Sequence, residues 1–338
     1  MILVTGATGM VGAHLIWHLL QQHQKITATR RHTSQLDNIV STFKFYTNDP
    51  QQYLDRIDWI ILDLNDHHVV NQALVKADTV YHCAAFVSLT NSDKQVFETN
   101  INSTKHLVDA CISNGVKRFC FVSSIAACGK SETDKWVTES IPWKDSPHTS
   151  EYARSKHLSE LEVWNGIAQG LDAVIVNPGV IIGVSSSTTG SSQLFHLIKK
   201  GLKVYTKGGS GYVDVRDVVK IIIQLTEQNI SGERFILVAQ NCTNKEVFAM
   251  IADGLKLTRP FIYMGKYPLI LVAIMMKVAG KLLNFTPSID LRMARTSSNR
   301  AYYDASKIRD LLHYDFIPIS KSIKDVCEFM DNSEFSQK

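Results

Sequence analysis

Two residues four positions apart, Tyr152 and Lys156, have side chains and a spacing that could perform acid–base chemistry. Residues at this spacing share one face of a helix, so both side chains could point into one cleft. An ammonium group beside a phenol favours the phenolate and lowers a phenol pKa that starts near about 10. Such a tyrosine could exchange a proton with a carbonyl or alcohol oxygen near neutral pH. The alternative is a solvated pair on a surface helix, because the spacing alone is common.

Hydroxyl and amide groups elsewhere could complete the same site. Ser123 and Ser124 end a predicted strand over residues 118–123, where a hydroxyl could hydrogen-bond the reacting oxygen. A helix or turn cap is the other interpretation of this pair. Asn100 lies in a predicted helix of about residues 94–114 and could bridge to the backbone near the active site.

The chain begins with a pattern that is typical of dinucleotide binding. The apolar strand Ile2–Val4 runs into the turn TGATGMVG at residues 5–12, and an amphipathic helix follows. Gly6 permits the tight turn, Gly9 lets a pyrophosphate approach the backbone, and Gly12 lets the helix pack closely on the strand. The helix N-terminus adds N–H groups and the positive end of a dipole. In this context the turn is a strong signal, and we expect cofactor contacts from Gly6, Thr8, Gly9, Met10, Val11 and Gly12.

The residues after the second predicted strand, Ile26–Thr29, bear on the choice of cofactor. Dinucleotide folds usually place an acid here to bind the adenosine ribose. This chain has Arg30 and Arg31 instead, and a guanidinium would suit a 2′-phosphate. We therefore favour NADP(H) over NAD(H), with a solvated arginine pair as the alternative. Asp63, at the end of the third predicted strand, could accept a hydrogen bond from the adenine amino group or cap a turn before Asn65.

The elements that must position these residues alternate between strands and helices. This order predicts an α/β fold with a parallel, doubly wound Rossmann-type sheet, which binds ligands at the C-terminal ends of its strands. We assign residues 1–176 to a dinucleotide-binding domain, to which 212–232 return, and residues 177–211 and 233–330 to a smaller substrate-binding lobe. Residues 183–192 are predicted to form a mobile loop and 331–338 a frayed tail. The expected strands are 2–4, 26–29, 59–63, 79–84, 118–123 and 173–176, and the expected long helices are 10–22, 94–114 and 150–169.

The bulk composition excludes several classes of protein. The chain has 338 residues, of which 45% are hydrophobic and 20% charged, with a net charge of +4 and scattered basic residues, so no nucleic-acid partner is expected. Six cysteines without a CxxC pair indicate reduced, mostly buried thiols of a cytoplasmic protein. No histidine or cysteine pair has metal-ligand spacing, so no metal is expected. Because a predicted strand starts at Ile2, we expect no signal peptide.

The segment 267–276, YPLILVAIMM, is almost entirely apolar. Lys277, Gly280 and Lys281 interrupt it, so it is too short to span a bilayer. We expect a buried or cleft-lining helix. The alternatives are peripheral lipid contact through residues 268–283 or the wall of an apolar substrate pocket.

Together, and in this order, the motifs resemble the extended short-chain dehydrogenase/reductase family within the NAD-dependent epimerase/dehydratase superfamily. The resemblance covers most of the chain. It rests on TGATGMVG at 5–12, Asp63-Leu64, HCAA at 82–85, Asn100 with Ser103-Thr104, VSSIAACG at 122–129, Tyr152 with Lys156, Asn177-Pro178-Gly179, VDVRD at 213–217 and YDASK at 303–307.

The resemblance implies a role for each matching residue. Tyr152 would be the acid/base, Lys156 would bind the nicotinamide ribose and tune Tyr152, and Ser124, five residues before Gly129, would polarise the substrate oxygen. The family usually dimerises through the helices matching 94–114 and 150–169, so a homodimer is expected, although burial of their apolar positions against the chain's own core fits equally. Further cofactor contacts are expected from Asp63, Leu64, Cys83, Ala84, Ala85, Val122, Pro178, Gly179 and Val180.

Three branches of this family compete. Sugar-nucleotide 4,6-dehydratases place an acidic pair after the catalytic hydroxyl, where this chain has Ile125-Ala126. Sugar-nucleotide epimerases commonly prefer NAD and carry an arginine where this chain has Ser210-Gly211, although Arg295 or Arg300 could bind a diphosphate. The sequence NPGVIIG at 177–183, the arginines after the second strand and the apolar segment resemble the dihydroflavonol-4-reductase and 3β-hydroxysteroid dehydrogenase branch.

The favoured hypothesis is an oxidoreductase that moves a hydride between NADP(H) and a carbonyl or secondary alcohol of a small, fairly apolar substrate. A sugar-nucleotide epimerase with internally recycled NAD is the first alternative. A cofactor-binding sensor without turnover is the second, although such relatives usually lose the tyrosine or the lysine, and Tyr152 and Lys156 are both present. We expect the substrate contacts to come from residues 86–90, 125–131, 183–192 and 260–300.

Overall fold

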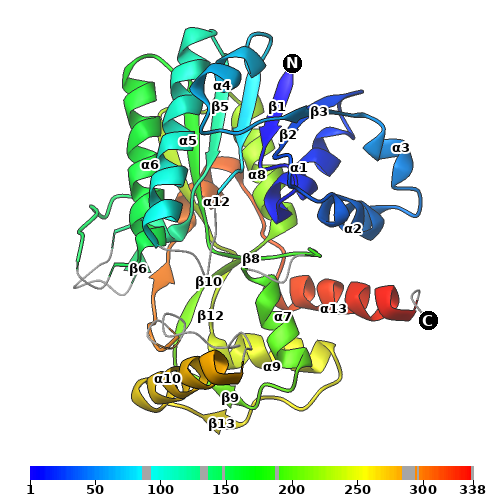
Figure 1. Cartoon of the computed structure of the whole chain (residues 1–338), viewed down its shortest axis with the longest axis vertical. Helices are drawn as coiled ribbons and strands as arrows, with labels where there is room; N and C mark the ends of the chain where they lie inside the picture. Colours follow the sequence, from blue (N-terminus) through cyan, green and yellow to red (C-terminus); the bar gives the residue numbers. More distant parts are fainter. Residues whose placement is uncertain are drawn as a thin grey trace.

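The structure of the chain, a computed structural model, describes residues 1–85, 93–129, 136–146, 149–186, 190–283, 294 and 297–335. A larger α/β body stands above a smaller lobe in Figure 1, and the N-terminus lies in the larger body. The chain crosses between the two bodies more than once, so each is built from segments distant in sequence.

The larger body is organised around a sheet of seven parallel strands in the order β11-β7-β5-β4-β1-β2-β3. This confirms the predicted doubly wound Rossmann-type fold. The strand order reverses between β4 and β1, and ligands of such sheets bind outside the strand ends at that point. The strands are β1 (Ile2–Thr5), β2 (Ile26–Arg30), β3 (Ile57–Ile61), β4 (Thr79–His82), β5 (Arg118–Val122), β7 (Ala173–Pro178) and β11 (Glu233–Leu237).

Helices cover both faces of this sheet. Alternate strand residues point to opposite faces, so Leu3 and Phe119 join one apolar cluster while Val4 and Cys120 join the other. The face of Leu3 is covered by α4 (His67–Ala73), α5 (Asp93–Ser113) and α6 (Glu151–Ala168). The face of Val4 is covered by α1 (Met10–Leu19), α2 (Asp37–Tyr46), α3 (Gln51–Leu54), α8 (Val215–Glu227) and α12 (Ser306–Leu312).

The smaller lobe has its own three-stranded sheet, in the order β12-β10-β8. Its core includes Ile182, Phe195, Tyr212, Val247 and Ile323, all buried. The sheet strands are β8 (Val180–Ile182), β10 (Gly209–Asp214) and β12 (Gln240–Thr243), and the packed helices are α7 (Ser192–Lys199), α9 (Asn244–Gly254) and α13 (Ile319–Phe335). Two short strand pairs lie in the lobe or at its border: β6 (Trp136–Val137) with β14 (Tyr302–Tyr303), and β9 (Val204–Tyr205) with β13 (Ile262–Tyr263). The remaining elements are the short helix η1 (Ile125–Ala127) and the longer helix α10 (Lys266–Leu283).

Two segment boundaries differ from the sequence-based assignment. Residues 212–232 do not all return to the larger body, because β10 stays in the small sheet and only α8 packs on the large one. Residues 233–330 are not all in the smaller lobe either, because β11 pairs with β7 at the edge of the large sheet.

The chain changes sheets at Asp214, which caps α8 by accepting a hydrogen bond from the Arg216 N–H at 2.7 Å. Arg216 in turn pairs with Asp325 of α13 at 2.8 Å, so part of the VDVRD motif holds the lobe together.

Two other predicted segments end elsewhere. The loop expected at 183–192 gives way to α7 at Ser192, and residues 187–189 lie outside the described part of the chain. The tail expected to fray from residue 331 continues as helix α13 to Phe335, and residues 336–338 lie outside the description.

The apolar segment 267–276 forms most of α10, and the expected burial is found on one face only, while a cleft-lining role stays a prediction. Leu269 and Ala273 are buried, whereas Tyr267 is 81% exposed and Leu271 is 58% exposed. The reason is that α7, α9 and α13 already enclose the core of the lobe, so α10 covers little of it. Among the described residues, none of the helices is both long and apolar enough to cross a membrane.

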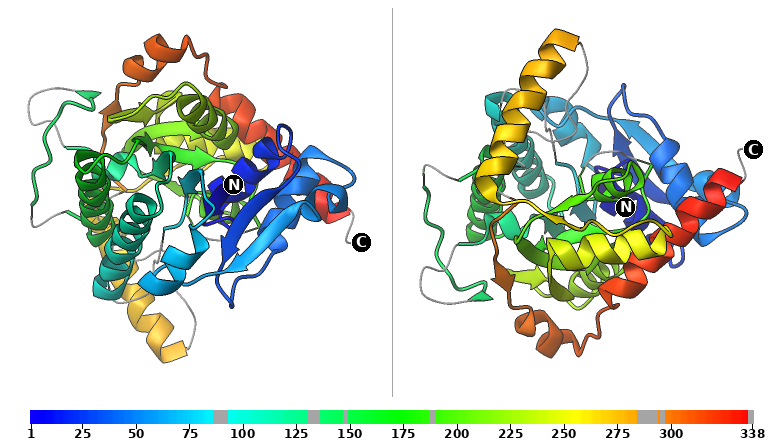
Figure 2. Two further views of the ribbon diagram at one scale, coloured as in Figure 1. Left: turned by 90° about the horizontal axis from the view of Figure 1, so that it is seen from above. Right: turned by 90° about the horizontal axis from the view of Figure 1, so that it is seen from below.

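The two long helices expected at a dimer interface, α5 and α6, lie side by side on the larger body in both views of Figure 2. They share one buried cluster that includes Leu107, Cys111 and Val163. These apolar residues are therefore buried within the chain, and dimerisation through the same helices stays a prediction.

Candidate active site

The turn between β1 and α1 is shaped by its glycines. Gly6 has a φ of +67°, and a Cβ there would lie 2.4 Å from the backbone nitrogen of Ala84, after β4. The Gly9 N–H donates to the Gly6 carbonyl at 2.9 Å, which closes the turn. A Cβ on Gly12 would lie 2.3 Å from the Gly6 carbonyl oxygen, so this glycine sets the approach of α1 to the strand.

The open side of this turn fits an anionic ligand. Gly9 is exposed, and a Cβ there would meet only the Gly6 carbonyl oxygen at 3.2 Å. No side chain caps α1, and its first turn contains no acid. The first N–H groups of a helix have no partner within it, so those of Met10 and Val11 suit the pyrophosphate of a dinucleotide. Thr8 lies partly exposed at the same turn.

Arg30 is the best-placed of the residues expected near the adenosine. It ends β2 and is partly buried, and its Nε is buried without a hydrogen-bond partner among the described residues. A buried unpaired polar atom is costly, so this nitrogen suits an anionic group of a ligand. Arg31, by contrast, is exposed.

Asp63 and Leu64 follow β3 rather than end it. Asp63 is exposed, and its Oδ1 accepts hydrogen bonds from the backbone N–H and the side-chain amide of Asn65, both at 3.0 Å. This is the turn cap that the sequence left as an alternative. The Leu64 carbonyl accepts a hydrogen bond from His106 of α5 at 3.1 Å, which ties this turn to the opposite face of the sheet.

The first turn of α6 brings Tyr152 against Ser124, which follows β5. Burial raises the pKa of Tyr152, and a hydrogen bond with the Ser124 side chain opposes this rise. Both residues keep part of their surface exposed. Ser124 Oγ also accepts a hydrogen bond from the Ala126 N–H at 3.1 Å, which fixes its position. Two hydroxyls thus lie together where a substrate oxygen could reach both.

Lys156 lies one helical turn beyond Tyr152 and is buried. Its ammonium donates to the Val122 carbonyl at 3.0 Å and lies 5.0 Å from the centre of the Phe121 ring. Burial lowers the pKa of Lys156 to about 8, and the negative charge of Glu160 opposes this fall. Lys156 is therefore mostly protonated at neutral pH. The expected lowering of the Tyr152 pKa by this charge is not found, because burial raises that pKa and Lys156 is not among the groups that shift it.

Glu160, one turn further along α6, is a residue that the sequence analysis missed. Its carboxylate is buried and accepts hydrogen bonds from Ser123 Oγ at 2.5 Å, Asn177 Nδ2 at 2.5 Å and Arg234 Nη1 at 3.3 Å. Burial raises the pKa of Glu160, and the bonds from Ser123 and Asn177 oppose this rise. All three partners donate, which fits an ionised carboxylate. The network joins α6, β5, β7 and β11 behind the candidate site.

We expect a Glu160→Gln variant to shift the pH dependence of activity. Loss of the Glu160 charge removes the interaction that raises the pKa of Lys156, which lies at about 8. The pKa of Lys156 is then lower, so Lys156 loses its proton at a lower pH than in the wild type. The alkaline limb of the pH profile therefore moves to more acidic values. The measurement is kcat against pH for the wild type and the variant.

Glu162→Gln is the matched control, because Glu162 lies on the same helix and is absent from this network. An alkaline limb that stays in place in Glu160→Gln, in a protein with native far-UV circular dichroism, would contradict the role of Glu160 toward Lys156.

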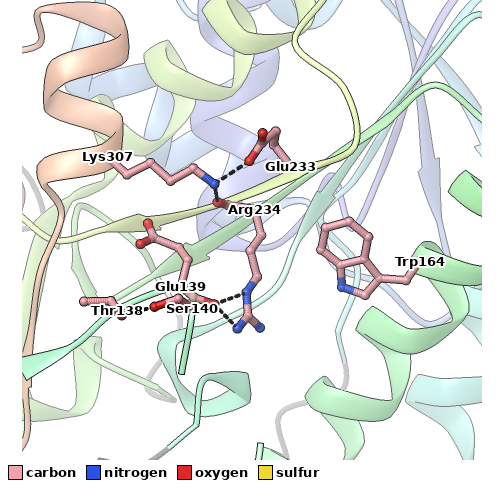
Figure 3. Close-up of a pocket in the computed structure, with 7 residues that line it drawn as sticks. All are labelled: Thr138, Glu139, Ser140, Trp164, Glu233, Arg234 and Lys307. Carbon is pink, nitrogen blue, oxygen red and sulfur yellow. Dashed lines mark hydrogen bonds and ion pairs between the residues drawn. The ribbon is translucent and has the colours of Figure 1, made fainter. Parts of the chain in front are cut away.

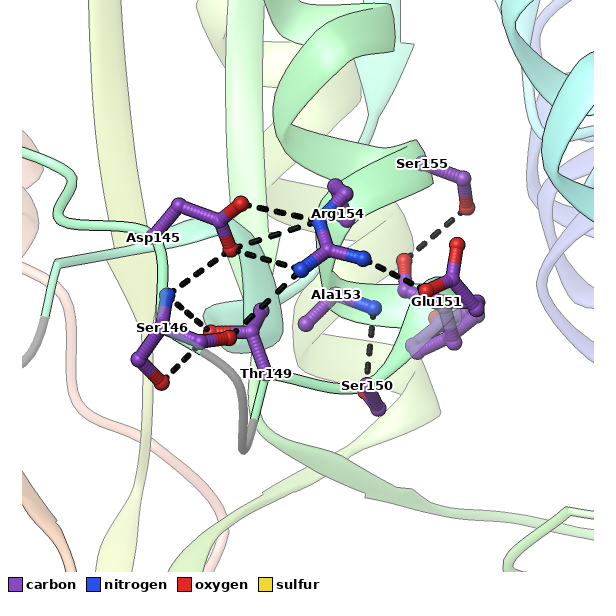
Figure 4. A network of polar contacts seen from close by, with 9 residues as sticks. Asp145, Ser146, Thr149, Ser150, Glu151, Ala153, Arg154 and Ser155 are labelled. Carbon is purple, nitrogen blue, oxygen red and sulfur yellow. Dashed lines mark hydrogen bonds and ion pairs between the residues drawn. The ribbon is translucent and has the colours of Figure 1, made fainter.

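A second polar network fixes the start of α6. Ser150 caps the helix by accepting a hydrogen bond from the Ala153 N–H at 3.1 Å. Arg154 donates from Nε and Nη2 to Asp145 at 3.0–3.2 Å and from Nη1 to Glu151 at 2.5 Å, as Figure 4 shows. The helix turn that carries Tyr152 is thereby tied to the preceding loop.

Asn100 packs α5 against α6 close to the lysine. Its side-chain amide donates a hydrogen bond to Ser155 Oγ at 3.4 Å. Its backbone carbonyl accepts hydrogen bonds from Ser159 Oγ at 3.2 Å and from Thr104 Oγ1 at 2.8 Å. Thr104 also contacts His82 Nε2 at 3.2 Å. The structure therefore places Asn100 beside the helix that holds Tyr152 and Lys156, and a catalytic role for it stays a prediction.

The strand ends bring the remaining expected cofactor contacts to the same edge. Val122 is held by Lys156, and Asn177 donates to the Ser124 carbonyl at 2.9 Å. A Cβ on Gly179 would lie 2.4 Å from the Gly211 carbonyl, so this glycine lets β10 pass close to the end of β7. Pro178 is buried and Val180 opens β8, while Cys83, Ala84 and Ala85 follow β4 with some surface exposed.

Asn38 of α2 is another residue that the sequence did not single out. Its side-chain amide donates to the Thr8 carbonyl in the glycine turn at 2.9 Å. Its Oδ1 accepts from Ser185 Oγ at 2.7 Å and from the Ser186 N–H at 2.9 Å. One buried amide thus connects the glycine turn to the segment that leads into the smaller lobe.

A shallow hollow elsewhere does not belong to this site. Figure 3 shows it lined by Glu139, Trp164 and Arg234, with the ion pair between Lys307 and Glu233 at its rim. Arg234 donates to the Glu139 carbonyl there and reaches Glu160 with Nη1. This hollow therefore lies behind the network that supports Lys156.

Several expected substrate contacts fall outside the described residues. They are 86–90, 130–131, 187–189 and the stretches 284–293 and 295–296, the last of which includes Arg295.

Comparison with known proteins identifies the family. Residues 2–239 match the model of the "NAD dependent epimerase/dehydratase family". A protein of Synechocystis sp. named "Putative dihydroflavonol 4-reductase" is 28% identical over 97% of this chain and 94% of its own length. "Sterol demethylase protein B" of Methylococcus capsulatus is 29% identical over 74% of this chain and 73% of its own length.

The fold is shared with solved structures at lower identity. The structure named gox2253 has a TM-score of 0.79 and 21% identity, and the alignment covers 98% of both chains. This likeness shows that the two chains share one fold. Because the family model matches well over half of the residues, the chain belongs to the NAD-dependent epimerase/dehydratase family.

Proposed function

We propose that this protein is an NADPH-dependent reductase of a carbonyl group in a small, fairly apolar substrate. The observation that carries the proposal is the placement of the Tyr152 hydroxyl beside Ser124, with the buried Lys156 one helical turn further along α6. The similarity to a named reductase over 97% of the chain favours carbonyl chemistry over other reactions of the family.

In this proposal each side chain has one task. A bound nicotinamide cofactor would supply the hydride for the carbonyl carbon. Ser124 would donate a hydrogen bond to the carbonyl oxygen, and Tyr152 would deliver its hydroxyl proton to that oxygen. Lys156 would stabilise the resulting phenolate through its positive charge. The reverse reaction would oxidise a secondary alcohol with the same residues.

The decisive experiment follows NADPH absorbance on purified protein. The substrates are apolar ketones and aldehydes beside UDP- and dTDP-linked sugars, with product analysis for each. We expect NADPH consumption with at least one carbonyl compound. If the NADPH concentration stays constant while a sugar nucleotide is converted to its epimer, the epimerase alternative is correct and the proposal is wrong.

The preference for NADPH is proposed to rest on Arg30. An Arg30→Ser variant should bind NADPH about ten- to a hundredfold more weakly, because hydrogen bonds to charged groups contribute about 1.5–3 kcal/mol. NADH affinity should change little. Binding of each cofactor is measured by fluorescence titration.

Arg31→Ser is the neighbouring control, and we expect a smaller effect because Arg31 is exposed. Equal losses of NADPH and NADH affinity in Arg30→Ser would refute the assignment of this arginine to a 2′-phosphate.

A further inference from the structure

Exposed apolar side chains are concentrated at one end of the smaller lobe. Of the 14 large apolar residues that are exposed in the described part of the chain, eight lie between residues 257 and 275. The most exposed are Tyr267 (81%), Phe261 (64%), Leu271 (58%) and Met275 (55%). Contiguous exposed apolar surface in a water-soluble fold marks a site of interaction.

The apolar residues of α10 form a stripe along one face. Tyr267, Leu271, Ile274 and Met275 are spaced by four, three and one positions, which places them on the same side of a helix. The other face packs inward through Leu269 and Ala273. Both panels of Figure 2 show α10 projecting beyond the rest of the molecule. The side chains of its stripe are 43–81% exposed.

The strand before α10 extends this surface. Ile262 and Tyr263 of β13 are exposed and pair with β9. Phe261 precedes them, and its N–H donates to the Lys203 carbonyl at 3.0 Å. We call the surface formed by Phe261, Tyr263, Tyr267, Leu271, Ile274 and Met275 the α10 tip.

The α10 tip lies among basic residues. The two stretches around it, residues 199–213 with β9 and residues 254–283 with β13 and α10, contain nine lysines and arginines and no aspartate or glutamate, which leaves 27 basic and 32 acidic residues elsewhere. Asp253, one residue before the second stretch, pairs with Arg259 at 2.6 Å. The basic residues look scattered in the sequence, yet the pairing of β9 with β13 brings the two stretches together. Lys203, Lys207 and Lys266 are exposed there, and the Lys207 ammonium lies 5.0 Å from the centre of the Tyr263 ring.

We propose that the α10 tip binds the surface of a lipid bilayer that contains anionic phospholipids. An interfacial helix of this kind inserts an apolar face among the acyl chains while lysines meet the headgroup phosphates. Tyrosines at its margin suit the boundary between water and hydrocarbon. A second copy of the chain fits less well, because a symmetric contact would bring the same lysines together without an acid from either stretch.

The test is co-sedimentation of the full chain with vesicles. One set contains phosphatidylcholine only, and the other contains phosphatidylcholine with phosphatidylglycerol. We expect binding to the anionic vesicles that is at least about tenfold stronger than to the neutral ones and that weakens as salt is added. Equal binding to both sets, or binding to neither, would overturn the proposal.

Two double variants separate the contributions. Leu271→Asp with Ile274→Asp should reduce binding to anionic vesicles by about tenfold or more, because charges enter the inserted face. Lys203→Glu with Lys207→Glu should remove the preference for anionic vesicles, and it keeps the test usable if the first variant folds poorly.

Leu311→Asp is the matched control, because Leu311 is an exposed leucine (43%) on α12 of the larger body. Its vesicle binding should equal that of the wild type, and a loss equal to that of the α10 double variant would contradict specific binding through the α10 tip.

Light scattering after gel filtration completes the test. A change from dimer to monomer in the α10 double variant would assign the surface to a second copy instead of a membrane.

Discussion

A Tyr152→Phe variant is expected to lose about 10²- to 10⁴-fold in kcat for carbonyl reduction, which is the usual contribution of a positioned acid. The change removes the only hydroxyl that we assign to proton delivery and keeps the ring in place. Ser124 loses its contact with Tyr152 but keeps the hydrogen bond from the Ala126 N–H, and it is partly exposed and can bond water, so the cost to folding should be small. NADPH affinity should stay near the wild-type value.

The measurement is the initial rate of NADPH oxidation at saturating substrate, together with a fluorescence titration of NADPH. Tyr205→Phe is a suitable control, because Tyr205 lies on β9 in the smaller lobe. If Tyr152→Phe retains more than about a tenth of the activity, proton delivery by this residue is wrong, since a general acid contributes at least about 10²-fold.

The second large effect is expected from the glycine turn, where two neighbouring glycines should behave differently. Gly12→Ala should lower the free energy of unfolding by roughly 3 kcal/mol, in the upper range for overpacked positions. Its Cβ would lie 2.3 Å from the Gly6 carbonyl oxygen and 2.8 Å from the Ala7 Cα. Both are backbone atoms, so α1 must move away from β1.

Gly9→Ala should leave stability within about 1 kcal/mol of the wild type, since most substitutions away from such clashes have small effects. Its φ of −80° suits alanine, and the nearest atom lies at 3.2 Å. The new methyl group would instead occupy the side of the turn that we assign to the pyrophosphate, so NADPH affinity should fall. Urea denaturation and cofactor titration of both variants distinguish these outcomes. Wild-type NADPH affinity in Gly9→Ala would place the dinucleotide elsewhere.

The residues predicted from sequence were those whose local context carries the signal. Gly6, Gly9 and Gly12 stand between a strand and a helix, and Tyr152 and Lys156 share a helix, so short-range spacing was sufficient. The alternation of strands and helices likewise indicated the parallel sheet, which the structure confirms.

The residues that were missed depend on contacts distant in sequence. Glu160 looks like a solvated helix residue until β11 brings Arg234 to it from 74 positions away. The chain returns from the small sheet to the larger body at α8, just before β11. No local sequence pattern indicates this return. The sequence of α10 is almost uniformly apolar, so it could not show which face of the helix is buried. Burial depends on how much of the core of the smaller lobe is already covered by α7, α9 and α13.

The Asn38 amide has a thermodynamic consequence. It hydrogen-bonds Thr8 in the glycine turn and Ser185 and Ser186 at the entry to the smaller lobe, so these two segments are ordered by the same side chain. A ligand that orders one segment therefore reduces the entropy still to be lost at the other. Linkage is reciprocal. The factor by which bound cofactor raises the affinity for substrate therefore equals the factor by which bound substrate raises the affinity for cofactor. The ligand pair would then assemble cooperatively, and Asn38 would set the size of that coupling.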